Sequence, residues 1–166
     1  LESSLADAAL TSRATARDLA TMWRECFSSP AALAVEVVNH MTEPGKLGSA
    51  QHAKAMFDLA KTVGIPPVIT NAVRYIEPDG ALTADVLDSA RYLEPLGLFI
   101  PQPNAQAWLK SSHQMATLAL EVTEDTNESV ALLRTTELLA QKCSLDPIND
   151  CGWNQPKTPE QSSLGV

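Results

Sequence analysis

The chain has 166 residues, of which 45% are hydrophobic and 19% are charged, and its formal net charge is −8. This length corresponds to one domain that buries about 68–70% of its unfolded surface, so a core needs neither metal ions nor disulfides. Nucleic-acid binding depends on clustered cations, and the excess of acids therefore argues against it. No apolar run approaches the roughly 20 residues of a membrane span.

The first two predicted helices span residues 2–27 and 30–41. In the first, apolar side chains recur at helical spacing from Ala16 onward, which gives the helix one apolar stripe. The second begins where Ser29 can act as the N-cap and Pro30 fits the first helical position, because a backbone N–H there has no partner within the helix.

Three further helices are predicted in the centre of the chain, where three patterns of helical period are separated by proline and glycine. They run from Ser49 to Gly64, from Pro66 to Pro78 and from Thr83 to Pro95. Each pattern is apolar on one side only. None of these helices is stable alone, so all three are expected to pack on one another or on neighbours.

The last two predicted helices follow a proline-rich segment. One opens at residue 103 or 104 and extends to about residue 122, with Trp108 on its apolar face. The other begins at Asp125, which has the spacing of a capping box, and ends near residue 143.

Together these patterns predict an all-α fold. We expect a single domain over residues 1–151, built as a bundle or array of six to seven short helices, with residues 98–100 as a candidate short extended segment. Residues 152–166 lack a period and are rich in turn formers, which predicts a mobile or surface-lying C-terminal tail. The chain starts at Leu1 rather than Met, which indicates a processed or excised N-terminus.

The chain has three cysteines, Cys26, Cys143 and Cys151, so at least one is left unpaired. An odd count favours a reducing, cytoplasmic compartment, although the sequence does not determine the compartment. Cys26 is expected to be a small core residue, because it lies on the apolar stripe beside Trp23. A disulfide between Cys143 and Cys151 is the alternative for an exported chain.

Neither a catalytic nor a metal-binding pattern is present in the sequence. The three histidines, His40, His52 and His113, are far apart, and none lies one helical turn from another His or a Cys, so no metal and no cofactor are expected. His52 is expected to face solvent. Residues 75–86 alternate like a calcium loop but begin with Tyr and end with Val, where carboxylates are required. The sequence therefore favours a protein that is not an enzyme, while a catalytic site assembled from distant helices stays open.

The segment over residues 96–108 is the strongest functional lead. Leu98, Phe99 and Ile100 are consecutive, so an extended chain directs them to both faces and cannot bury all three against one surface. Either the segment is sandwiched inside the fold, or part of it is an exposed apolar patch that docks a partner. Alternation favours burial of Phe99 with Leu98 or Ile100 facing outward. These three residues and Trp108 form the predicted partner-binding site.

The predicted function is a non-enzymatic protein–protein interaction or assembly module, such as an adaptor, effector or structural accessory protein. Its partner would be another protein or a second copy of the chain. The alternative is a helical carrier of an apolar small molecule, because helical bundles can open cavities between helices. An exposed apolar patch would favour the first function, and an enclosed apolar cavity would favour the second.

Overall fold

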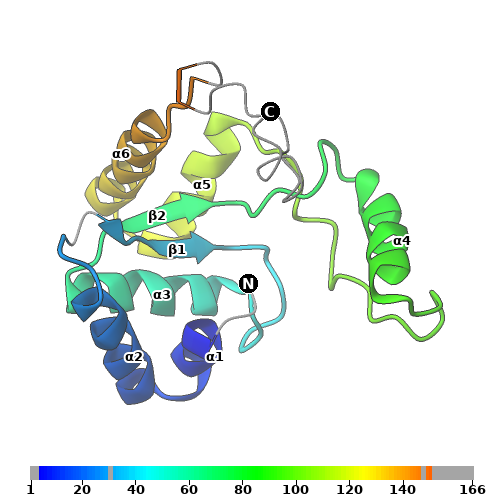
Figure 1. The fold of residues 1–166 in the computed structure, drawn as a ribbon, viewed down its shortest axis with the longest axis horizontal. Coiled ribbons are helices and arrows are strands. Elements are labelled where there is room, and N and C mark those ends of the chain that lie inside the picture. Colours follow the sequence, from blue (N-terminus) through cyan, green and yellow to red (C-terminus); the bar gives the residue numbers. More distant parts are fainter. Residues whose placement is uncertain (1–3, 30–31, 147–148, 151–166) are drawn as a thin grey trace, which may run out of the picture.

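The computed structural model describes residues 4–29, 32–146 and 149–150. Cys151 and the predicted tail over residues 152–166 lie outside the described residues. The described part is mostly helical and includes one small sheet (Figure 1). Its elements are α1 Ser4–Thr11, α2 Arg13–Glu25, β1 Val35–Val38, α3 Ala50–Val63, β2 Pro67–Thr70, α4 Gly80–Tyr92, α5 Ser112–Thr123 and α6 Thr126–Lys142.

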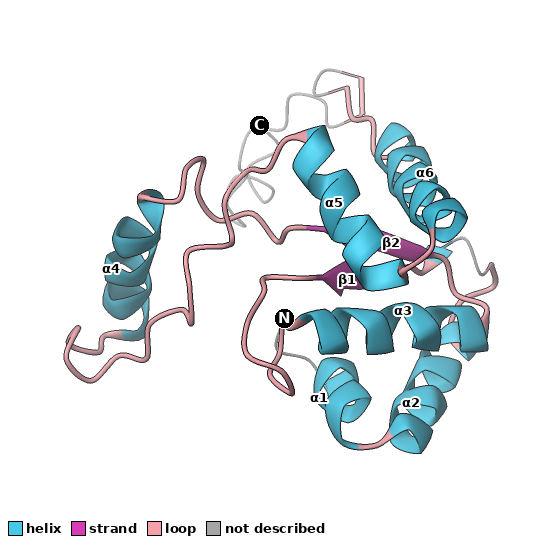
Figure 2. Ribbon diagram, turned by 180° about the vertical axis from the view of Figure 1, so that it is seen from behind, coloured by secondary structure: helices cyan, strands magenta, loops and turns pink. Residues whose placement is uncertain are grey.

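The centre of the molecule is a parallel pair of strands joined by a helix. β1 and β2 pair in parallel, with Val35 opposite Pro67 and Val38 opposite Thr70. α3 makes the crossover between them, as parallel strands require. Helices cover both sides of the pair: α5 and α6 lie on one side, and α3 with α1 and α2 on the other (Figure 2).

The predicted helices over residues 30–41 and 66–77 are therefore wrong, and the fold is mostly helical with a two-stranded sheet rather than all-α. The strand sequences, VEVV and PVIT, are rich in β-branched residues, which fit a pleated surface better than a helix. Short apolar runs look alike in buried strands and buried helices. Pro67 begins β2, a position where a missing N–H is tolerated.

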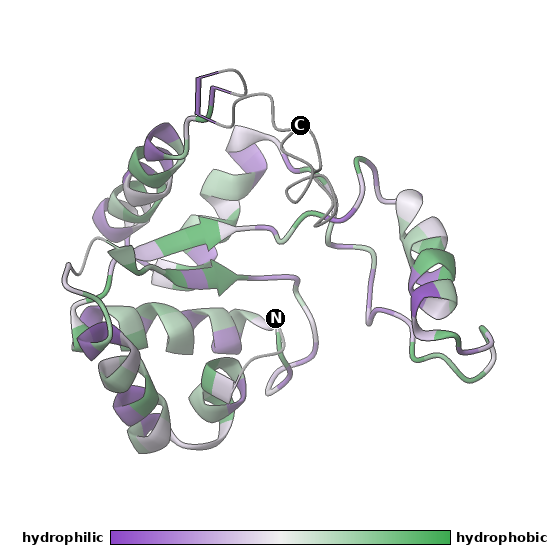
Figure 3. Cartoon of the chain, in the orientation of Figure 1, coloured by the Kyte–Doolittle hydropathy of each residue, from purple (hydrophilic) through white to green (hydrophobic). Residues whose placement is uncertain are grey.

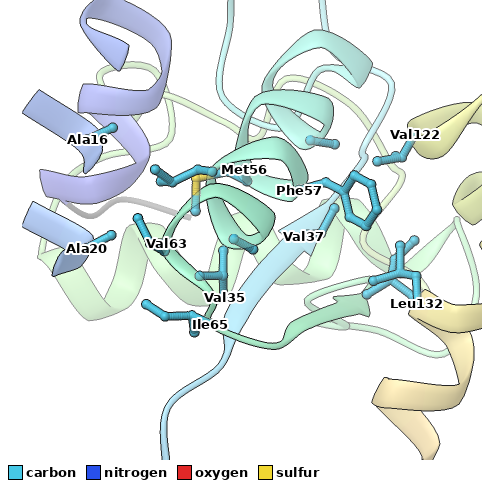
Figure 4. Packing of buried hydrophobic residues seen from close by; sticks show 14 of the residues in the cluster. Ala16, Ala20, Val35, Val37, Met56, Phe57, Val63, Ile65, Val122 and Leu132 are labelled. Atoms are coloured by element: carbon cyan, nitrogen blue, oxygen red, sulfur yellow. The ribbon is translucent and has the colours of Figure 1, made fainter. Parts of the chain in front are cut away.

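One apolar core joins both sides of the sheet. Val37 of β1 lies beside Phe57 of α3, and the Phe57 ring faces Val122 of α5 and Leu132 of α6 (Figure 4). Leu118, Val37, Val122 and Leu132 are the largest apolar side chains with almost no exposed surface among the described residues. This close packing fixes α5 and α6 relative to β2.

The predicted helix over residues 2–27 is broken into α1 and α2. Ser12 separates them and caps α2, since its side chain accepts a hydrogen bond from the Thr15 N–H at 3.3 Å. Ala16 and Ala20 are buried against α3, and their small side chains allow the two helices to approach closely. The expectation that Cys26 is buried is wrong, because Cys26 is the exposed C-cap residue beyond the last turn.

The predicted ends of α3 and α6 are confirmed. Ser49 caps α3, Gly64 ends it in the left-handed conformation (φ 68°), and Asp125 caps α6. The helix expected from residue 103 or 104 instead begins at Ser112, after a capping box formed by Ser111. Trp108 precedes that helix and is not part of it. Within the described ranges, no helix is long and apolar enough to cross a membrane.

Candidate interaction surface

Residues 71–110 form an excursion from the core that carries α4, and we call this segment the arm. Its two ends are held together at Asn71, whose side-chain amide donates to the carbonyl of Gln106 at 2.8 Å and to that of Trp108 at 2.6 Å. Lys110 donates to the Asn71 side-chain oxygen at 3.2 Å and lies over the Trp108 ring at 5.1 Å from its centroid. Burial lowers the pKa of Lys110. The arm therefore leaves and re-enters the core through one polar cluster.

The base of the arm is a short parallel bridge between Tyr75 and Trp108. The Leu109 N–H donates to the Tyr75 carbonyl at 3.0 Å, and the Ala107 N–H donates to the Tyr75 hydroxyl oxygen at 3.2 Å. Gly80 packs so closely on this tyrosine that a Cβ at position 80 would lie 2.7 Å from the Tyr75 Cβ. Tyr75 thus fixes both the return segment and the start of α4.

The polar side of α4 faces the rest of the arm. Asp88 accepts two hydrogen bonds from the Arg74 guanidinium, and this pairing lowers the pKa of Asp88. Asp85 accepts from the Gln102 N–H at 3.2 Å, and the buried Ser89 hydroxyl donates to the Glu94 carbonyl. These three polar side chains of α4 therefore bond to partners that lie in the arm but outside the helix.

The apolar side of α4 faces away from the arm. Leu82 is 72% exposed and Leu87 is 65% exposed, and Val86 between them is also exposed. Leu93 ends the helix in the left-handed conformation (φ 57°), which disfavours residues with a side chain, and is 90% exposed. A surface helix normally turns its charged side to water and its apolar side inward. On α4, Asp85 and Asp88 are instead turned toward the arm while Leu82 and Leu87 are exposed. Figure 3 shows stretches of hydrophobic colour on this helix.

The structure separates the four residues predicted to bind a partner. Leu98 and Ile100 are exposed, whereas Phe99 is partly buried and stacks on Tyr92 with ring centroids 6.3 Å apart. Residues 95–99 form a turn rather than an extended segment, because the N–H groups of residues 98 and 99 both donate to the Pro95 carbonyl. Trp108 lies at the base of the arm, away from the other three, and has a structural role there.

Sequence reasoning missed Leu82, Leu87 and Leu93. Leu87 and Leu93 fall on the apolar side of the helix predicted from Thr83 to Pro95, which is expected to pack on other helices, and Leu82 lies before that helix. Spacing alone does not distinguish an apolar stripe that packs within the chain from one that faces outward. We call the exposed side chains of Leu82, Val86, Leu87, Leu93, Leu98 and Ile100 the apolar face of the arm.

Two of the three histidines, His40 and His52, are buried, and His113 is exposed. In the described part of the chain, no three His, Cys, Asp or Glu side chains converge as a metal site. His40 is buried and its Nε2 lies 2.8 Å from the Asn71 carbonyl, so this histidine supports the cluster at the ends of the arm. Burial lowers the pKa of His40. The expectation that His52 faces solvent is wrong, because His52 is 2% exposed.

No protein-family model matches the chain, and no curated protein matches it.

Proposed function

We propose that the protein is a non-enzymatic protein–protein interaction or assembly module that docks its partner on the apolar face of the arm. One observation carries the proposal: α4 directs Asp88 inward to Arg74 and directs Leu82 and Leu87 outward to water. Exposed apolar patches of this kind are typical of interaction sites. Burial of one exposed leucine side chain on docking contributes about 1.5–3 kcal/mol to binding. Several such side chains are needed to exceed the entropic cost of association.

The charges around the apolar face indicate the chemistry of the partner. Exposed carboxylates lie at both ends of α4, with Glu77 and Asp79 before its first turn and Glu94 after its last. Arg91 is the exposed base on the helix itself. Complementary charge steers association and sets orientation more than it adds affinity. The expected partner surface is therefore an apolar patch with basic side chains at its rim, on another protein or on a second copy of this chain.

Site-specific photocrosslinking tests the proposal directly. A benzoylphenylalanine at position 87 would lie on the apolar face of the arm. One at position 130 would lie on the exposed side of α6, where Val130 is about as exposed as Leu87. We expect protein adducts at position 87 that are absent at position 130, detected by mass spectrometry in extract of the source cells and with the purified protein alone. Adducts with a second copy of the chain would identify self-association.

A matched pair of variants then links the adducts to affinity. Leu82→Ser with Leu87→Ser should remove the adducts, whereas Val130→Ser with Leu138→Ser on α6 should retain them, because all four side chains are exposed. Thermal melts should show that both double variants stay folded. The proposal fails if position 87 gives no adduct beyond that at position 130, or if the arm variant unfolds the isolated chain and so shows that these leucines are core residues.

A further inference from the structure

A groove of about 570 Å³ lies between α2 and α3, with the second half of α1 beside it. The apolar residues that line it are small except for one leucine: Ala9, Ala14, Ala16, Ala55 and Leu59. Grooves with an apolar lining bind amphipathic helices, whose larger side chains fill the space between the two walls. The small side chains of this groove leave room for leucine and valine side chains from a docking helix.

Three of the four charged side chains that line the groove are basic. Arg13 and Arg17 lie one turn apart on α2, and Lys61 comes from α3. The fourth, Asp58, lies one turn from both Lys54 and Lys61 on α3, so its charge is largely offset there. Lys61 pairs with a glutamate of α6, and the Arg17 side chain lies 3.8 Å from the carboxylate of the next residue. Arg13 makes no ion pair in the described part of the chain.

The arm carries the opposite charge beside its apolar face. Glu77 and Asp79 precede the first turn of α4, and neither carboxylate forms an ion pair with another described residue. Leu82 and Val86 follow within the next two turns, one turn apart and exposed. The beginning of α4 therefore combines two free acids with two apolar side chains, which complement the two arginines and the alanine lining of the groove.

We propose that this groove binds α4 of a second copy of the chain, with Leu82 and Val86 against the alanines and with Glu77 and Asp79 beside the arginines of α2. The inference rests on the proposed function of the arm and names its partner. An apolar surface with a basic rim is the surface that the charges of the arm require, and the groove supplies one. The groove and α4 lie at opposite ends of the molecule, so a copy does not fill its own groove (Figure 1).

A contact of this kind joins two different surfaces, so each copy can bind one neighbour through its arm and another through its groove. Repetition of the contact produces a ring or an open chain of copies. We therefore expect sedimentation velocity to show dimers and longer species of the native chain as its concentration rises. Added salt should shift them toward the monomer, because it screens the charges at the rim.

Two variants, each with one of the two surfaces disabled, test the arrangement. Leu82→Ser with Leu87→Ser disables the arm, and Arg13→Glu with Arg17→Glu disables the groove. Each variant alone should associate about a hundredfold more weakly than the native chain, since it loses apolar contact or brings like charges together. A mixture of the two should form a complex with one copy of each, because the first retains its groove and the second retains its arm. Direct contact between two copies of α4 would give no such complex.

Charge variants provide the controls. Arg134→Glu with Lys142→Glu makes the same change in net charge at exposed positions of α6 outside the groove, and it should assemble as the native chain does. Glu77→Lys with Asp79→Lys, combined in one chain with the reversed groove, should restore assembly because the two rims then exchange charge. Asp79 makes no side-chain hydrogen bond as the cap of α4, so its substitution removes none.

Thermal melts should show that the reversed groove stays folded, because both arginines are exposed. Ala14→Tyr, which fills the groove from an exposed position, is the second groove variant and should give the same loss of assembly. A native chain that stays monomeric at high concentration would overturn the inference. Failure of the two disabled variants to form the mixed complex, or equal effects of the groove and α6 charge reversals, would also overturn it.

The outcomes for the arm and for the groove are distinguishable. Photocrosslinking at position 87 to a different protein, without adducts to a second copy, would support docking on the arm and overturn the docking of α4 in the groove. Absence of adducts of either kind would overturn both.

Discussion

The guanidinium of Arg74 donates two hydrogen bonds to the carboxylate of Asp88, with Nη1 to Oδ2 at 2.6 Å and Nη2 to Oδ1 at 2.7 Å. Both donors of Arg74 must meet both acceptors of Asp88. The pairing therefore sets the orientation of α4 as well as holding it close to Arg74. It turns α4 about its own axis so that the side carrying Leu82 and Leu87 points to solvent. The exposure of the apolar face therefore follows from a specific polar contact inside the arm.

Arg74→Lys should loosen α4 without affecting the core. Lysine retains the charge but cannot reproduce the two parallel hydrogen bonds. We expect hydrogen exchange of the amides in α4 to become several-fold faster, while the amides of α3 exchange as before. Arg91→Lys is the matched control, since Arg91 is exposed on the same helix and lies over the Tyr92 ring. Equal effects of the two substitutions would contradict the orienting role of Arg74.

Gly80→Ala should destabilise the base of the arm by about 1–3 kcal/mol, the usual cost of inserting a methyl group into a filled space. The added carbon would lie 2.7 Å from the Tyr75 Cβ, so the bridge or α4 must shift. Gly97→Ala is the control, because a Cβ there meets nothing within 4 Å. Hydrogen exchange of the Leu109 amide, which bonds to Tyr75, reports the shift. Unchanged exchange in Gly80→Ala would show that this contact is not tight.

Leu132→Ala should lower the free energy of unfolding by about 2–5 kcal/mol, through lost burial and the cavity that remains. Leu132 is 1% exposed where α6 meets the core beside β2. Leu138→Ala on the same helix should change it by about 0.5 kcal/mol or less, because Leu138 is 49% exposed. Urea denaturation compares the two variants directly. Similar losses for both would mean that α6 packs by a different side.

Stability should fall as the pH decreases through about 6.5. Burial lowers the pKa of both His40 and His52 below the ordinary histidine value of 6.5, so the unfolded chain binds protons that the folded chain does not. The free energy of unfolding then decreases by at most about 1.4 kcal/mol per pH unit for each ring, until the folded rings are protonated as well. Urea denaturation at a series of pH values gives the slope.

The contribution of His52 to this slope can be isolated. His52→Asn should make the slope shallower than that of the native chain, because it removes one of the two rings whose pKa burial lowers. A slope that His52→Asn does not alter would mean that this ring titrates alike in the folded and unfolded chain.

The sequence predicted those elements whose signals are local. Ser49, Gly64 and Asp125 mark helix ends correctly because capping depends on the neighbouring residues alone. The strands could not be identified in this way. Val37 and Ile69 pair across the intervening α3, and a four-residue apolar run carries too little periodicity to exclude a helix.

The candidate site was predicted only in part, for a similar reason. The three consecutive apolar residues 98–100 predict that part of this segment is exposed, and Leu98 and Ile100 are exposed in the structure. The outward side of α4 depends on the contact between Arg74 and Asp88, and no pattern within the helix reveals that contact.

The side-chain amide of Asn71 binds the carbonyls of both Gln106 and Trp108, so the chain returns almost to the point from which it left. A segment closed in this manner can be shortened, lengthened or exchanged while the path of the surrounding chain stays the same, because doubling a loop costs only about 0.6 kcal/mol. Partner choice could then change by replacement of one such segment, and the protein would keep its core as a constant platform.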